Sequence, residues 1–341
     1  MNKNLLQECK IIIENRINEI LEGEIKRYKD NCFIKESLEE LKRLSKGGKR
    51  VRGYLIKLGQ MLFGKDDDSY IDIAAAIEIF QTAILIHDDV IDEADKRRGL
   101  DTINAKYAGQ IGISKAICIG DLGFFISYNI INNANISDDL KIEIMKVYSK
   151  TLYNTVNGEI IDVELPLKSL EYHKKMDDKL IYDIYVNKTA WYTIIGPILI
   201  GASSANASSL DKEKLMKMGE NLGIAFQIKD DLLGLYSEDD SMGKTLNDIK
   251  EGKQTIIYKY AIDHANKEEI EIINKYYGNS CVTIDENKII TDLFIKLGAK
   301  ENAEKLELEY TKKGIDIINS MDVKNKDLFM DFANYLLKRK N

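Results

Sequence analysis

The chain has 341 residues, 2 prolines and a formal net charge of −7 at pH 7. Its length would allow two domains, but no linker-like stretch divides it, so we predict a single domain over residues 1–341. The acidic balance argues against a general nucleic-acid-binding protein, which would present a basic face. It is compatible with a small anionic substrate, because the local field in a cleft decides such binding.

Several features bear on the compartment. Residues 1–21 carry interspersed charges instead of the apolar centre of a signal peptide. The longest apolar stretch, residues 192–202, contains Gly196 and Pro197 and is shorter than the roughly 20 residues that span a bilayer. We therefore expect no transmembrane segment. The cysteines lack metal or disulfide spacing, which is typical of a reduced, cytoplasmic protein; they are Cys9, Cys32, Cys118 and Cys281.

Apolar residues recur at three- and four-residue spacing from the N-terminus onwards, as in Leu5, Ile13, Ile17 and Leu21. This period is that of amphipathic helices, so the pattern predicts an all-α fold.

A basic segment, Gly47-Gly48-Lys49-Arg50-Val51-Arg52-Gly53, opens one of these helical runs. Glycine freedom, unpaired N–H groups and the helix dipole all favour an anion at such a position. A solvated basic turn is the alternative.

The next run ends in an aspartate cluster, Asp88, Asp89 and Asp92, directly after the apolar segment 83–87. On a helix, Asp88 and Asp92 share a face, whereas Asp89 points about 100° away. Arg97 and Arg98 follow and are close enough to bind the same phosphates.

Lys188 and Thr189 stand at the head of another apolar run, and a second pair of acids, Asp230 and Asp231, ends the run 222–229. The two acidic groups lie 142 residues apart (230 − 88), so we expect separate helices that face each other across a cavity, as metal sites in helix bundles do. Lys244, Asp248 and Lys253 follow the second pair.

Both acidic groups lie where the pattern predicts burial, and buried carboxylates require partners. Magnesium is usually held by one or two carboxylates together with substrate phosphates. The two groups therefore indicate a magnesium–diphosphate site.

The ordered set of motifs resembles the trans-isoprenyl diphosphate synthases, also called polyprenyl synthetases, over nearly the whole chain. The motifs are 48–52, 88–92, Arg97-Arg98, Gly120-Asp121, Gly158 to Asp162, Lys188-Thr189, 226–231, Gly243-Lys244-Thr245, Asp248 and 251–255. The resemblance implies helices around a deep central cavity, usually in a homodimer. It also implies head-to-tail condensation of isopentenyl diphosphate with an allylic diphosphate.

The resemblance further implies residue roles. Three magnesium ions would be bound by Asp88, Asp92 and Asp230, while Asp89, Asp231 and Asp162 would support this site without binding the metal directly. Isopentenyl diphosphate would contact Lys49, Arg52, Gln81 and Arg98. The allylic diphosphate would contact Arg97, Lys188, Lys244 and Lys253. Thr189 and Gln227 resemble the residues that turn oxygen dipoles towards the carbocation.

Two positions depart from the family pattern. Gly234 replaces the final aspartate of the second acidic motif, and Gly53 stands where proline is common. The first departure puts a ligand at residue 234 in doubt, and the second should affect stability more than chemistry.

In the family, side chains shortly before the first aspartate cluster limit product length, and here these are Phe80, Ala83 and Ile84. The small Ala83 favours a geranylgeranyl or longer product. Alternatively, Ala83 packs against a neighbouring helix while the tunnel floor is formed by Phe124, Phe125 or Tyr128.

Other functions remain as alternatives. They are a farnesyl diphosphate synthase, a class I terpene cyclase, a non-catalytic partner subunit and a purely structural helical protein. Lys49 and Arg52, which would hold a second diphosphate, argue against a cyclase, and the retained aspartates argue against a non-catalytic subunit.

Overall fold

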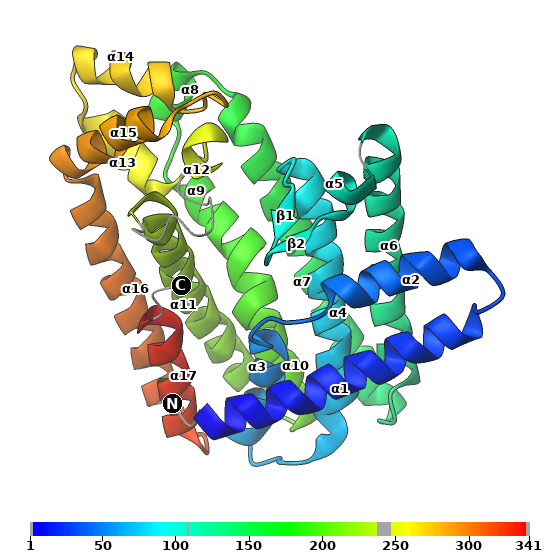
Figure 1. Ribbon diagram of the computed structural model, residues 1–341. Coiled ribbons are helices and arrows are strands. Elements are labelled where there is room, and N and C mark those ends of the chain that lie inside the picture. The colour runs from blue at the N-terminus through cyan, green and yellow to red at the C-terminus, as the bar shows by residue number, and fades with distance from the viewer. Residues whose placement is uncertain (1–2, 108, 237–246, 339–341) are drawn as a thin grey trace. The chain divides into compact units, whose positions relative to one another are not determined.

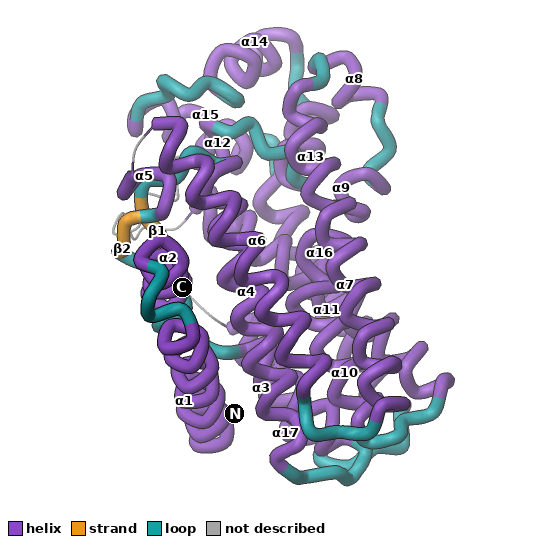
Figure 2. Tube along the Cα trace, turned by 90° about the vertical axis from the view of Figure 1, so that its right-hand side faces the viewer, coloured by secondary structure: helices purple, strands orange, loops and turns teal. Residues whose placement is uncertain are grey.

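The computed structural model describes residues 3–107, 109–236 and 247–338. Helices make up most of this part of the chain, and its strands are two short ones that form a hairpin (Figures 1 and 2). The all-α prediction is thus confirmed. Internal contacts divide the chain into two compact units. Asn2–Val147 with Pro197–Ala207 is called the N-terminal unit, and Tyr148–Gly196 with Ser208–Asn341 the C-terminal unit. That residues 1–341 form one domain stays a prediction.

The first part of the chain forms the elements α1 (Lys3–Arg27), α2 (Cys32–Leu44), α3 (Val51–Leu62), η1 (Asp68–Tyr70), α4 (Ile71–Ile91), β1 (Lys96–Arg97), β2 (Leu100–Asp101), α5 (Ile103–Tyr107) and α6 (Gly109–Asn133). α7 (Asp138–Glu164) begins in the N-terminal unit and continues in the C-terminal unit. The core of the N-terminal unit is α4, against which α1, α3 and α6 pack. α4 and α6 lie side by side in both views (Figures 1 and 2). The burial of α4 follows from its sequence, because apolar residues cover nearly its whole circumference.

Within the part of the chain that the structure describes, two helical segments are long and apolar enough to cross a membrane by length and composition alone. The segment Asp68–Ile91 has 72% of its apolar window buried within the protein, as a core helix does, whereas Gly109–Asn133 has 39% buried. Both are longer than residues 192–202, which the sequence led us to regard as the longest apolar stretch. Two such helices are weak evidence for a membrane span, so the expected absence of one stays a prediction.

The remaining elements are η2 (Leu165–Leu167), α8 (Leu170–Lys175), α9 (Lys179–Ile184), the π-helix η3 (Tyr185–Ile195), α10 (Gly196–Ser204), α11 (Ser209–Tyr236), α12 (Asn247–Lys250), α13 (Ile256–His264), α14 (Lys267–Tyr276), α15 (Ile284–Lys296), α16 (Ala299–Ser320) and α17 (Lys326–Lys338). These elements belong to the C-terminal unit, except that α10 after Gly196 belongs to the N-terminal unit. There α11 packs against η3 and α16, and α11 and α16 run side by side (Figure 1).

Local sequence explains where several of these helices begin. α15 starts with a capping box in which Thr283 Oγ1 accepts from Glu286 N, while the Glu286 carboxylate accepts from Thr283 N at 2.9 Å. α14 has the same arrangement between Asn266 and Glu269. Each box satisfies N–H groups that the first helical turn leaves unpaired.

Candidate active site

The first acidic cluster closes α4, and its members have different surroundings. α4 ends at Ile91, and Asp92 caps it through an N–H bond to the Asp88 carbonyl of 2.8 Å. The Asp88 side chain is 19% exposed, whereas Asp89 is 2% exposed. One helical turn therefore separates Asp88 from Asp92, as expected, and Asp89 points into the protein.

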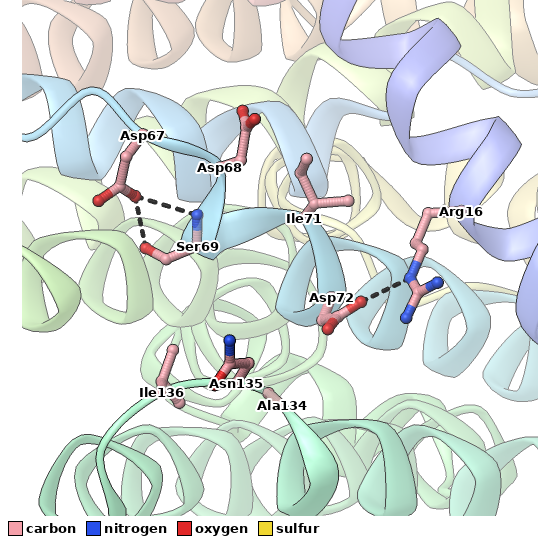
Figure 3. A pocket seen from close by; sticks show the side chains of 9 residues that line it. All are labelled: Arg16, Asp67, Asp68, Ser69, Ile71, Asp72, Ala134, Asn135 and Ile136. Atoms are coloured by element: carbon pink, nitrogen blue, oxygen red, sulfur yellow. Dashed lines mark hydrogen bonds and ion pairs between the residues drawn. The ribbon is translucent and has the colours of Figure 1, made fainter.

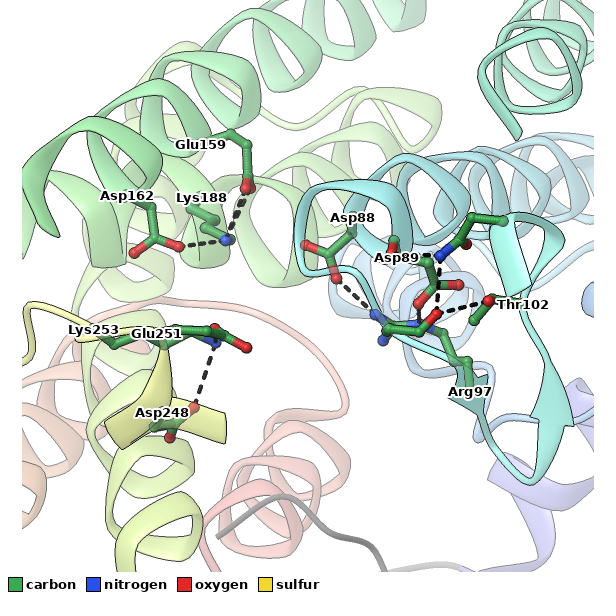
Figure 4. Close-up of polar contacts among 12 residues, drawn as sticks. Asp88, Asp89, Arg97, Thr102, Glu159, Asp162, Lys188, Asp248, Glu251 and Lys253 are labelled. Carbon is green, nitrogen blue, oxygen red and sulfur yellow. Dashed lines mark hydrogen bonds and ion pairs between the residues drawn. The ribbon is translucent and has the colours of Figure 1, made fainter. Parts of the chain in front are cut away.

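The β1–β2 hairpin brings Arg97 back to these carboxylates (Figure 4). Arg97 Nη2 lies 2.8 Å from Asp88 Oδ2, and Arg97 Nε donates to Asp89 Oδ1. Burial raises the pKa of Asp89, and the charge of Arg97 opposes that shift. Asp89 thus holds the Arg97 side chain in place.

Arginines from two segments gather beside this hairpin. The side chain of Arg98 rests against Gly48, where an added Cβ would lie 3.1 Å from Arg98 Nη1. Burial lowers the pKa of Arg98, and the nearby charges of Arg50, Arg97 and Arg52 lower it further. Cations crowded in this way are stabilised by an anion, which is what the basic segment 47–53 predicts. Lys49, from the same segment, is exposed.

Glu78 organises this loop, although no motif in the sequence pointed to it. It is 4% exposed, accepts from Gly53 N at 3.0 Å and lies 3.5 Å from Arg50 Nη1. Its signal was an acid inside the apolar run of α4. Glu78 also explains Gly53, because proline would lack the donated N–H and an added Cβ would lie 2.6 Å from Ile13.

The substrate-binding and chain-length candidates in the middle of α4, residues 80–84, differ in their surroundings. Gln81 is 7% exposed, and its buried Oε1 has no hydrogen-bond partner among the described residues. Ala83 is fully buried, and an added Cβ on Gly123 of α6 would lie 2.9 Å from it. Phe80 packs on Phe124 with ring centroids 5.4 Å apart, and Ile84 is half-buried. This favours the alternative in which Ala83 packs against a neighbouring helix.

The Gly120-Asp121 motif fixes His87, the residue before the aspartate cluster. A Cβ on Gly120 would overlap the His87 ring, so only glycine leaves room for it. His87 Nε2 lies 3.1 Å from the Ile117 carbonyl and 3.6 Å from Asp121 Oδ1. The end of α4 is thereby fastened to α6.

In the C-terminal unit, Lys188 of η3 is held by two acids of α7 (Figure 4). Its Nζ lies 2.9 Å from Glu159 Oε2 and 2.5 Å from Asp162 Oδ2. A Cβ on Gly158 would overlap the Lys188 backbone, so the glycine allows α7 to approach η3 this closely. Asp162 therefore helps to hold the Lys188 ammonium group in place.

A buried network surrounds the second acidic pair. Asp231 is 6% exposed; its Oδ2 accepts from the Tyr185 hydroxyl and its Oδ1 from Gln227 Nε2 at 2.9 Å. Burial raises the pKa of Asp231 to about 7, although both hydrogen bonds lower it. Thr189 Oγ1 lies 2.5 Å from Gln227 Oε1. Asp230, the predicted ligand, is half-buried. Tyr185 was not predicted; its signal was a tyrosine one turn before Thr189.

Lys253 is held on the turn after α12. Its Nζ lies 3.4 Å from Asp248 Oδ1 and 3.1 Å from Glu251 Oε2 (Figure 4). The Tyr277 hydroxyl donates to the Lys253 carbonyl at 2.5 Å. A Cβ on Gly234 would overlap Asp248 Oδ2. Lys244, with Gly243 and Thr245, lies outside the described residues.

A polar groove of about 510 Å³ opens elsewhere in the N-terminal unit (Figure 3). It lies at the start of α4, whereas Asp88 lies near its end. Asp72 pairs with Arg16 at 2.6 Å, and Asp67 accepts from Ser69 N at 3.0 Å. These acids are satisfied locally, so we do not assign the groove to the predicted site.

The donor chemistry suits magnesium, because the candidate ligands are carboxylates. Within the described ranges, no cluster of three or more His, Cys, Asp or Glu side chains forms a ready-made metal cage. Magnesium rarely uses such a cage and relies on substrate phosphates for part of its coordination. The residues present therefore fit the ion.

Comparison with known proteins places these features in one family. The family model for polyprenyl synthetase matches residues 34–293. The geranylgeranyl diphosphate synthase of Sulfolobus acidocaldarius is 30% identical over 320 residues, which cover 92% of this chain and 91% of that protein. The short chain isoprenyl diphosphate synthase of Methanocaldococcus jannaschii is 30% identical over 82% of this chain and 81% of its own.

Among solved structures, a geranylgeranyl pyrophosphate synthase from Corynebacterium glutamicum, complexed with isoprenyl diphosphate and magnesium, matches with a TM-score of 0.88. It is 25% identical, and the match covers 98% of this chain and 99% of that one. The motifs, the all-α fold and these matches agree, and the chain belongs to the polyprenyl synthetase family of prenyltransferases.

Proposed function

We propose that this prenyltransferase condenses isopentenyl diphosphate head-to-tail with an allylic diphosphate and releases a trans-polyprenyl diphosphate of geranylgeranyl length or longer. The observation that carries the proposal is the pairing of Arg97 with the aspartate cluster, next to a group of arginines in which Arg50, Arg52 and Arg97 surround Arg98. That combination suits a diphosphate and its counter-ions. The names of the relatives, which include geranylgeranyl and geranylfarnesyl diphosphate synthases, support the product class.

We assign the magnesium ligands as Asp88, Asp92 and Asp230, with three ions per site. When bound, magnesium neutralises the diphosphate and makes it a better leaving group. Asp89 and Asp231 are buried and hydrogen-bond to neighbouring side chains, and Asp162 pairs with Lys188. We therefore assign these three aspartates to positioning of other site residues and not to binding of the metal.

The cations divide between two substrates. Isopentenyl diphosphate would be bound by Lys49, Arg52 and Arg98, with Gln81 beside them. The allylic diphosphate would be bound by Arg97, Lys188, Lys244 and Lys253. For Arg97, Lys188 and Lys253, acids hold the charged group in place before substrate arrives, which limits the ordering cost of binding.

The reaction then follows from charge. The allylic C–O bond breaks, and its electron pair leaves with the diphosphate, which the cations stabilise. Thr189 and Gln227 offer oxygen dipoles to the allylic cation. The isopentenyl double bond attacks the cation to form the new C–C bond, and the proton lost from the adduct passes to an oxygen of the released diphosphate.

We also propose a cytoplasmic homodimer. All four cysteines are free thiols, as is usual in a reducing compartment. α6 exposes a row of large apolar side chains, Ile111, Ile113, Ile117 and Phe125, with Phe125 66% exposed. A second copy of the chain would cover such a row. Sedimentation of the purified protein with and without the change Phe125→Asp tests this.

Product analysis tests the function. Purified protein is incubated with isopentenyl diphosphate and dimethylallyl, geranyl or farnesyl diphosphate, with magnesium or with EDTA. We expect a magnesium-dependent ladder that ends at geranylgeranyl diphosphate or beyond. A ladder that stops at farnesyl diphosphate would favour the shorter-chain alternative. Cyclic hydrocarbon without elongation would favour a class I terpene cyclase.

A further inference from the structure

We propose that Tyr185 is a positioning residue: through Asp231 it sets the direction in which Gln227 and Thr189 present their oxygens. The inference rests on the proposed function, because these are the oxygens assigned to the allylic cation. Thr189, Tyr185 and Asp231 are each less than a tenth exposed.

The Tyr185 hydroxyl has two partners whose roles are fixed by chemistry. Its oxygen accepts from Ile256 N at 3.0 Å, and a backbone N–H can only donate. The hydroxyl proton is therefore left for Asp231 Oδ2. The backbone at the start of α13 thus determines which way the tyrosine donates.

Asp231 passes this direction to Gln227. Asp231 Oδ2 accepts from the Tyr185 hydroxyl, and its Oδ1 accepts from the amide nitrogen of Gln227 at 2.9 Å. The amide oxygen then faces Thr189, whose Oγ1 lies 2.5 Å away. Because an amide oxygen only accepts, Thr189 donates its proton, and its own lone pairs face away from Gln227.

The consequence is that partly negative oxygen atoms, and not partly positive hydrogens, face the proposed reaction centre. Both Gln227 and Thr189 keep lone pairs that no bond within the network uses. Without the Tyr185 hydroxyl, Asp231 loses one of its two donors and is free to turn. The Gln227 amide can then reverse and present hydrogens, which repel a cation.

Removal of a single oxygen atom tests this. Tyr185→Phe is compared with Tyr182→Phe. Tyr182 is a neighbouring, half-buried tyrosine whose hydroxyl hydrogen-bonds to Tyr310 and not to this network. We expect Tyr185→Phe to lower kcat about tenfold with KM for isopentenyl diphosphate unchanged, a loss typical of a hydrogen bond to a charged group. A less stabilised cation is also captured more often by water, so the share of allylic alcohol among the products should rise. Tyr182→Phe should change neither quantity.

A second readout uses the protein without substrate or magnesium. The chain has six glutamines, so selective ¹⁵N-glutamine labelling gives few side-chain amide signals, and Gln227→Leu assigns the one of interest. We expect Tyr185→Phe to move the Gln227 signals and to speed exchange of its protons with solvent. Should that variant not fold, Asp231→Asn, which keeps the shape but removes one acceptor, should give the same change.

Unchanged Gln227 signals in Tyr185→Phe, or equal kinetic losses in both tyrosine variants, would overturn the proposal. If the wild-type protein elongates no primer, the proposed function fails. The glutamine spectra still decide whether Tyr185 orients Gln227.

Discussion

The carboxylate of Asp248 fills the space that a side chain on Gly234 would need. Asp248 Oδ1 also lies 3.4 Å from Lys253 Nζ. The same carboxylate therefore lies beside Gly234 and pairs with a proposed substrate-binding lysine. The glycine that departs from the family pattern is therefore matched by an acid from α12.

Restoring the family's aspartate should harm this chain. In Gly234→Asp the new Cβ would overlap Asp248 Oδ2 and a second negative charge would lie close by, so we expect a loss of about 1–3 kcal/mol in unfolding free energy together with lower turnover. Gly234→Asp combined with Asp248→Ala should recover part of the stability, because neighbouring changes do not add. Urea unfolding and kcat measure both effects. A single variant as stable as the wild type would mean that Asp248 moves aside without cost.

Two aspartates of the first cluster, Asp88 and Asp89, should separate effects on catalysis from effects on stability. Asp88→Asn should lower kcat at least about a hundredfold while the melting temperature changes little, because Asp88 is a proposed ligand and partly exposed. Asp230→Asn should behave similarly. Asp89→Asn serves as the contrast and should cost about 1–3 kcal/mol of stability, because it weakens a buried bond to Arg97. Near-normal turnover in Asp88→Asn would remove the metal assignment.

The buried position of Ala83 changes what its substitution would report. In Ala83→Phe the ring would collide with Gly123, so we expect destabilisation of about 1–3 kcal/mol or more along with any change in product. Ile84→Phe places the same ring at a half-buried position and should shorten the product with less loss of stability. Product chromatography and melting curves for both variants check this. If only Ala83→Phe shortens the product while folding normally, Ala83 lines the tunnel.

Gly158 should affect stability because its lack of a side chain lets the Lys188 backbone approach α7. Gly158→Ala would force α7 away from Lys188, and we expect a loss of about 1–3 kcal/mol and a higher KM for the allylic substrate. Gly23, which has open space around it, supplies the control in Gly23→Ala. Equal stability of the two variants would show that α7 and η3 can separate freely.

His173 should make stability depend on pH. Its Nε2 lies 2.9 Å from the Leu165 carbonyl and its Nδ1 3.2 Å from the Tyr258 hydroxyl, and burial lowers its pKa. The unfolded chain therefore takes up a proton first, so stability is present above about pH 6.5 and is lost as pH falls through the lower folded pKa. Urea unfolding at pH 7.5 and 5.5 should show a smaller difference for His173→Gln than for wild type. The exposed His264, changed to Gln, should leave the difference as it is.

The sequence was sufficient for those features that repeat or that carry chemistry. The spacing of apolar residues predicted the helices, and the order of short motifs predicted the family. The order of the motifs led us to expect Arg97 near the first aspartate cluster, and in the structure it pairs with Asp88. The pairing of Lys188 with Asp162 was not expected from the sequence.

Long-range packing accounts for what the sequence did not reveal. Glu78, His87 and Tyr185 act through partners that lie far away along the chain, so the local sequence around each of them does not show what it contacts. Ala83 was assigned from its distance to Asp88, but its surroundings depend on Gly123 of another helix. The two glycine departures likewise became intelligible only through Glu78 and Asp248.

The π-helix η3 has a consequence for how relatives are compared. Its wider turn holds one more residue than an α-helix does, because each N–H bonds a carbonyl five residues back. In a continuous helix, deleting one residue between Thr189 and Ile194 would turn Lys188 and Thr189 by about 100° relative to Ile194 and Ile195. The length of this segment, and not only its residues, therefore sets which side chains share a face, and an alignment without a gap here would equate positions that point in different directions.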